Sequence, residues 1–104
     1  MDDVGWFVEG LAVLVSGQLD AGHAGDPRAA IAANAAPVAL ASAWSGRYRY
    51  GVSGSMVRYI DVTYGRRTLN ALLPATSNQQ ILDRLHLSEA EFLNHWRAWA
   101  TMQP

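Results

Sequence analysis

The chain has 104 residues, half of them hydrophobic and four of them tryptophan, so it can bury a substantial core as one domain. Its formal net charge of −1 gives no electrostatic reason to expect nucleic acid or an anionic membrane as a partner. The absence of cysteine excludes disulfide bonds and thiolate metal sites.

The first predicted element is a helix from about Val4 to Leu19. Every residue of this run is apolar, small or neutral and polar, except Glu9. Apolar side chains would point almost all round such a helix, which indicates an interior position. Burying an ionised carboxylate is costly, so we expect Glu9 to be protonated, paired with an arginine or bound to a metal. Gly10 predicts that another helix packs closely here. The run has no basic leader, and Glu9 interrupts it, so it is a poor candidate for a signal peptide or membrane span.

The next segment, residues 20–26, is rich in small residues and predicts a loop. His23 within it could ligate a metal, but a lone histidine in a loop is expected to be solvated. Asp26 and Pro27 predict the start of a short, alanine-rich helix that ends before Pro37.

Arginine and tyrosine alternate over Arg47–Tyr50, after a run (38–44) that fits a helix and an extended segment equally well. The alternation fits a short strand or a nucleic-acid surface in which rings stack on bases. Four residues in a slightly acidic protein are thin support for nucleic acid. We therefore expect these arginines to pair with buried carboxylates, Glu9 among them.

A second main helix is predicted over Tyr50–Tyr64, because its apolar residues fall on one helical face. Three consecutive small residues (53–55) allow another helix to approach closely. Arg58 and Asp61 are spaced for an exposed i,i+3 ion pair. Gly65 is a suitable residue to end this helix.

The remaining chain predicts three shorter helices. One covers 66–73 and ends at a proline, and Ser77-x-x-Gln80 predicts a capping box for the next. Ser88-x-x-Glu91 predicts a capping box for the last helix, which presents an aromatic face to the core. Glu91 and His95 could chelate a metal on that helix, although a hydrogen bond between them is the favoured interpretation. We therefore predict an all-α single domain over residues 1–104, a compact bundle of about five to six helices.

Two motifs resemble the gluzincin zinc metallopeptidases. Trp-x-x-Glu-Gly-Leu-Ala at residues 6–12 resembles the helix that carries the third zinc ligand of that superfamily, at the position of Glu9. The segment Tyr50–Ile60, followed by Tyr-Gly at 64–65, resembles an aminopeptidase-like segment in which Tyr50 would stabilise the oxyanion. The matches cover roughly residues 4–73.

The chain also departs from the family pattern. It contains no His-Glu-x-x-His motif, which in gluzincins supplies two zinc ligands and the general base. Its three histidines all follow Glu9. Val13 stands where thermolysin-like enzymes have an aspartate. The chain therefore resembles the C-terminal helical half of such a domain.

Two functions are compatible with these features. In the first, the chain is part of a zinc peptidase-like domain: Glu9 binds zinc, Tyr50 acts on the peptide substrate, and the remaining machinery lies outside these residues. The chain alone is then expected to be inactive and to bind no zinc. In the second, it is a non-catalytic helical interaction module in which Glu9 pairs with Arg47, Arg49 or Arg58, or is neutral.

Both functions leave apolar surface that missing helices would cover. Such surface favours self-association. We therefore expect a homo-oligomer in which the helix over Trp6–Leu19 meets a partner.

Overall fold

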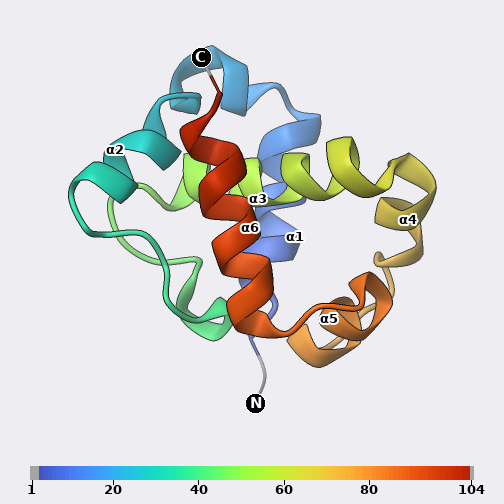
Figure 1. Ribbon diagram of the computed structural model, residues 1–104. Helices are drawn as coiled ribbons and strands as arrows, with labels where there is room; N and C mark the ends of the chain where they lie inside the picture. Colours follow the sequence, from blue (N-terminus) through green and yellow to red (C-terminus); the bar gives the residue numbers. More distant parts are fainter. Residues whose placement is uncertain (1–2, 104) are drawn as a thin grey trace.

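The computed structural model describes residues 3–103, and this part of the chain is entirely helical with no strand (Figure 1). The predicted all-α class is confirmed, with six α-helices among the described residues. Their bounds are α1 Gly5–Val15, α2 Asp26–Ala32, α3 Arg49–Tyr64, α4 Arg66–Ala71, α5 Asn78–Leu85 and α6 Glu89–Thr101. A π-helical turn, η1 (Leu19–His23), precedes α2, and a 3-10 turn, η2 (Leu40–Ser42), precedes α3.

Helix α3 is the centre of the molecule, with α6 in front of it and α1 behind it in Figure 1. The α1–α3 crossing is close because small residues meet there. A methyl group added at Gly10 would collide with the backbone carbonyl of Ser53, and one added at Gly54 would press on Val13. The close packing predicted at Gly10 is therefore confirmed.

The buried tryptophans connect the helices by hydrogen bonds as well as by packing. The Trp6 indole Nε1 donates to Asn78 Oδ1 (2.7 Å), which joins α1 to α5. The Trp96 indole Nε1 donates to Ser55 Oγ (2.9 Å), which joins α6 to α3. Both indoles thus bury a large apolar area without losing a hydrogen bond.

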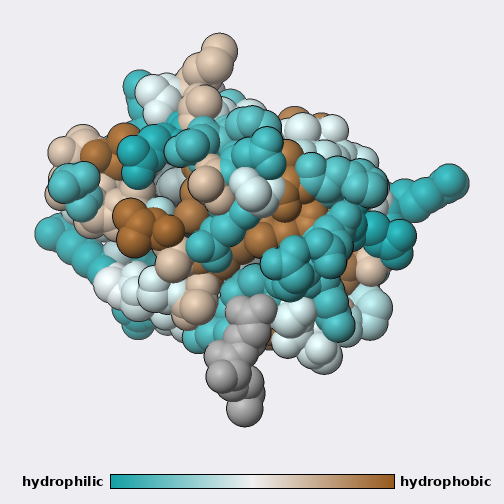
Figure 2. Space-filling view, turned by 60° about the horizontal axis from the view of Figure 1, so that its bottom comes forward, coloured by the Kyte–Doolittle hydropathy of each residue, from teal (hydrophilic) through white to brown (hydrophobic). Residues whose placement is uncertain are grey.

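Hydrophobic residues still reach the surface in places. On the face shown in Figure 2, brown residues gather in the middle and hydrophilic residues border them on most sides. No helix among residues 3–103 is both long enough and apolar enough to cross a membrane.

The predicted caps of the last two helices are largely confirmed. At α6, Glu91 N donates to Ser88 Oγ (3.1 Å) and Ser88 N donates to Glu91 Oε1 (2.8 Å), which completes the capping box. At α5, Ser77 Oγ accepts from Gln80 N (3.1 Å). The Gln80 side-chain oxygen, however, accepts from Thr76 N (2.7 Å), one residue before the predicted donor.

Three local predictions are wrong. Helix α1 ends at Val15 and not at Leu19, because Gly17 adopts a positive φ of 80° that breaks the helix. The predicted loop after it is the π-helical turn η1. Arg58 does not pair with Asp61: it pairs with Asp20 of η1 (3.0 Å), and Asp61 pairs with Arg66 (2.8 Å).

Candidate functional site

Glu9 lies on an exposed stripe of α1, not in the interior. The neighbouring Gly10 and Val13 face α3 and are buried, whereas Glu9 and Ala12 are exposed. Val8 and Val15 on the same stripe are 56% and 76% exposed. The prediction of an interior helix around Glu9 is therefore wrong, because α1 has a packing partner on one side only.

The carboxylate of Glu9 makes no hydrogen bond or ion pair with any residue in the described part of the chain. Each arginine expected to pair with it has other contacts. Arg47 lies over the ring of Tyr48, and Arg49 donates to the carbonyl of Gly46 (3.0 Å). Arg58 is bound to Asp20. A solvated carboxylate needs no buried cation, so the expected arginine pair does not form.

Tyr50 lies in the first turn of α3 and is 37% exposed. Its ring stacks on His23 with centroids 5.4 Å apart and forms a T-shaped contact with Trp44, with centroids 5.0 Å apart. The Arg49 Cζ lies 5.0 Å from the Tyr50 ring centroid, a cation–π geometry. These contacts hold the ring in place from several sides, while its hydroxyl makes no hydrogen bond with the described residues.

His23 is not the solvated loop residue that its sequence context predicts. Its Nδ1 lies 2.8 Å from Asp26 Oδ2, and both side chains are partly buried. In a neutral ring whose Nδ1–H donates to the carboxylate, Nε2 carries no proton. A methyl group at Gly51 would collide with Asp26 and with the backbone carbonyl of His23. The His23–Asp26 segment therefore rests directly on the first turn of α3, beside Tyr50.

The pairing of His23 and Asp26 left a weak sequence signal. The two residues are three apart and each follows a glycine, a pattern that also fits an ordinary flexible loop. Gly51 has no side chain and so allows His23 and Asp26 to pack against α3. It lies 25 or more residues further along the chain. Neither local spacing nor helical periodicity reports a contact of that kind.

The two residues that the sequence singles out, Glu9 and Tyr50, lie on helices that cross but are not bonded to each other. Gly10, next to Glu9, packs on Ser53, which is three residues after Tyr50. The Tyr50 ring, however, faces His23 and Trp44. The crossing brings the two helix segments together, but the Glu9 and Tyr50 side chains lie in different environments.

A complete zinc site does not fit the described residues. No group of three or more His, Cys, Asp or Glu side chains between residues 3 and 103 is placed to hold a metal ion. Zinc sites in proteins use three or four protein ligands, and Glu9 offers one carboxylate. Glu91 and His95 do not form the expected hydrogen bond, because Glu91 is engaged in the α6 cap.

The hydrogen bond from the Ser88 backbone N–H lowers the pKa of Glu91, with further contributions from the Ser88 side chain and from His95. The helix cap therefore uses the ionised carboxylate.

Comparisons of the chain with protein-family models, with curated proteins and with solved structures find no match.

Proposed function

We propose that this chain is the C-terminal helical part of a gluzincin-type zinc peptidase domain, in which Glu9 is one metal ligand and a segment outside this sequence supplies the others. The observation that carries this proposal is the state of Glu9: an exposed carboxylate with no partner among the described residues, on a stripe that is otherwise apolar. A helix surface of this kind suits a second helix packed over it, with a cation at the position of the carboxylate.

Tyr50 has the features of a group that acts on a substrate. Its ring is held by His23, Trp44 and Arg49, so its orientation is fixed before any ligand arrives. Its hydroxyl makes no hydrogen bond with the described residues. A donor that is already oriented stabilises developing negative charge on a carbonyl oxygen at no cost of reorganisation.

The chain alone is inactive in this proposal. It has neither the general base nor the two histidine ligands of the gluzincin motif, and one carboxylate does not hold zinc tightly. No catalytic step is therefore assigned to these residues by themselves.

The proposal is tested first by the coding DNA before the Met1 codon. We expect an in-frame His-Glu-x-x-His about 20 to 60 codons upstream, on a predicted helix that can place both histidines on one face. Calorimetric titration of the 104-residue chain with zinc should show only weak binding. Absence of the motif, or tight stoichiometric binding by the chain alone, contradicts the proposal.

A second candidate function is a non-catalytic module that self-associates. The exposure of Val8 and Val15 on one stripe of α1 favours it, because large apolar side chains on one helix face are typical of an interface. In this function Glu9 binds no metal and is only a solvated charge on an otherwise apolar helix surface.

A further inference from the structure

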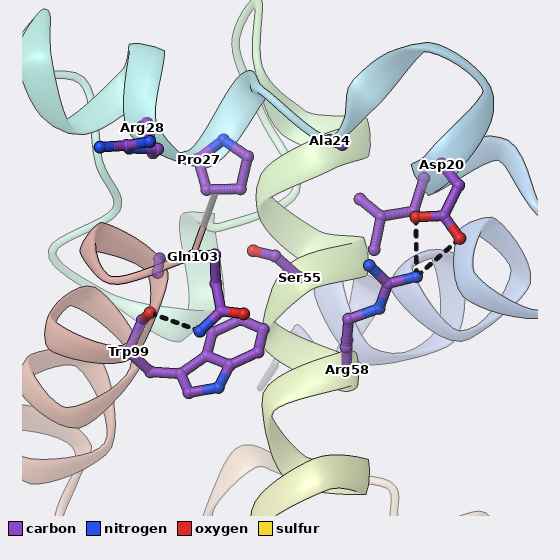
Figure 3. Close-up of a pocket in the computed structure, with 10 residues that line it drawn as sticks. Asp20, Ala24, Pro27, Arg28, Ser55, Arg58, Trp99 and Gln103 are labelled. Atoms are coloured by element: carbon purple, nitrogen blue, oxygen red, sulfur yellow. Dashed lines mark hydrogen bonds and ion pairs between the residues drawn. The ribbon is translucent and has the colours of Figure 1, made fainter.

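A pocket of about 240 Å³ lies on another part of the molecule, between η1, α2, α3 and α6 (Figure 3). None of its lining residues belongs to α1, and neither Glu9 nor Tyr50 borders it. The pocket is therefore separate from the proposed peptidase site, and a ligand can occupy it whether or not the chain belongs to a peptidase.

One side of the pocket offers an arginine with unused donors. Arg58 Nη2 donates to both carboxylate oxygens of Asp20, at 3.0 and 3.1 Å. Its Nε and Nη1 make no hydrogen bond with the described residues. Asp20 fixes the guanidinium without occupying these two nitrogens, so they remain available to a ligand (Figure 3).

The other side is formed by the end of α6 and by α3. Gln103 Nε2 donates to the carbonyl of Trp99 (3.0 Å), which leaves the amide oxygen turned toward the pocket in Figure 3. Ser55 Oγ donates to the Val52 carbonyl (2.8 Å) and accepts from Trp96. Ser55 is thus a rigid part of the wall and not a free hydroxyl.

Apart from Arg28, the rest of the lining is apolar. The Trp99 side chain, itself packed on Tyr59 with centroids 5.7 Å apart, lines the pocket together with Leu19, Pro27 and Ala100. An apolar wall with a few convergent polar groups is the usual composition of a small-molecule site. The volume is below the roughly 300–1,000 Å³ of drug-sized pockets, which limits a ligand to about the size of one amino acid.

The charges of the lining select an anion. Arg28 and Arg58 lie at opposite edges of the pocket, and Asp20 is the single acidic lining residue, already paired with Arg58 (Figure 3). A carboxylate can accept a charge-assisted hydrogen bond from Nε or Nη1 of Arg58, the two nitrogens that Asp20 leaves unused, and bonds of this kind are stronger than those between neutral groups. We infer that this pocket binds a small carboxylic acid with an apolar body, with its carboxylate on Arg58 and its body against Trp99. The acid is either free in solution or the C-terminal residue of a peptide.

N-acetyl-L-leucine is the probe that tests this inference, because it carries the carboxylate and an apolar body without an ammonium group. In an NMR titration of the ¹⁵N-labelled chain, one of the four tryptophan indole signals should shift saturably, and the variant Trp99→Phe should identify it as Trp99. L-leucinamide, which has no carboxylate, should produce no saturable shift. An acetylated tripeptide ending in leucine should bind as well if the source is a peptide terminus, and should fail to bind if the source is a free acid.

Three substitutions make the test specific. Arg58→Gln should weaken binding of N-acetyl-L-leucine at least about tenfold, the loss expected for a hydrogen bond to a charged group. Arg66→Gln is the matched control, since it breaks the other exposed arginine–aspartate pair, and Arg66 does not line the pocket. Asp20→Asn retains Arg58 and removes the negative charge, so it should bind equally or more tightly.

Several results would overturn the inference. These are the absence of a saturable shift at Trp99, equal binding of L-leucinamide, a loss in Arg66→Gln as large as in Arg58→Gln, or loss of binding in Asp20→Asn. Because Asp20→Asn leaves the pocket arginine in place, it decides the outcome even if Arg58→Gln does not fold.

Discussion

Two serines of α3, Ser53 and Ser55, are both buried but differ in their hydrogen bonds. Ser55 Oγ accepts from the indole of Trp96 (2.9 Å) and donates to the carbonyl of Val52. Ser53 Oγ has no hydrogen-bond partner in the described part of the chain. Since a buried polar group without a partner loses its hydration without compensation, the same substitution should have opposite effects at the two positions.

We predict that Ser53→Ala raises the free energy of unfolding by about 1 kcal/mol, because it removes an unsatisfied hydroxyl. Ser55→Ala should lower it by about 1–3 kcal/mol, because the Trp96 indole is left without an acceptor. Urea unfolding at neutral pH measures both. Equal destabilisation by the two substitutions would contradict the assignment of Ser53 as unpaired.

Gly10 is the second test at this scale. Gly10→Ala should lower the free energy of unfolding, because the cost of about 1–3 kcal/mol for overpacking against Ser53 exceeds the gain of about 1 kcal/mol in helix propensity. Gly22→Ala is the control, since its added methyl group meets nothing within 4 Å. A stabilised Gly10→Ala variant would mean that the two helices are further apart than described.

At the scale of the element, the cap of α6 depends on ionisation of Glu91. Its pKa lies below the ordinary 4.5, chiefly because the Ser88 backbone N–H donates to the carboxylate. A lowered folded-state pKa contributes stability that is present above the unfolded-state value and is lost as pH falls through the folded-state value.

The stability difference between wild type and Glu91→Gln should therefore be largest at neutral pH and should shrink once the pH falls below about 4.5. Urea unfolding at a series of pH values measures it. A difference that stays constant down to the lowest pH would show that the cap does not use the charge of Glu91.

Sequence reasoning identified the helices best where the signal is local. The caps at Ser77 and Ser88 and the aromatic face of α6 depend on residues three or four positions apart, so they could be predicted. The pairing of Arg58 with Asp20 joins residues 38 apart, and the stacking of His23 on Tyr50 joins two different elements. Contacts of this kind depend on how the helices cross, and local periodicity does not report it.

For helix α1, the sequence pattern predicts more burial than the structure shows. Its residues are apolar all round, and the sequence therefore predicts burial on every side. In the structure α1 is covered on its inner side, by α3 and, at Trp6, by α5 and α6, whereas Val15 on the outer side is 76% exposed. The apolar pattern identifies a helix that is suited to packing on both sides, whereas the described chain covers one side.

At the scale of the whole molecule, the exposed stripe of α1 predicts self-association. Size-exclusion chromatography with light scattering should give an oligomer at micromolar concentration, and Val15→Glu should convert it to a monomer without loss of folding stability. Val62→Glu is the matched control, because Val62 is 66% exposed on α3 and lies outside the stripe. A monomeric wild type, or equal dissociation by Val62→Glu, would contradict this prediction.

The most direct test of whether Glu9 is a metal ligand is the zinc affinity of the protein extended upstream to include the predicted His-Glu-x-x-His segment. The extended wild type should bind one zinc ion per chain. Glu9→Gln should weaken binding by at least about 100-fold, because loss of a direct ligand should cost more than loss of a group that only orients one. Asp83→Asn, which also neutralises one exposed carboxylate on a helix, should bind zinc like the wild type. Unchanged zinc affinity in Glu9→Gln would contradict the assignment of Glu9 as a ligand.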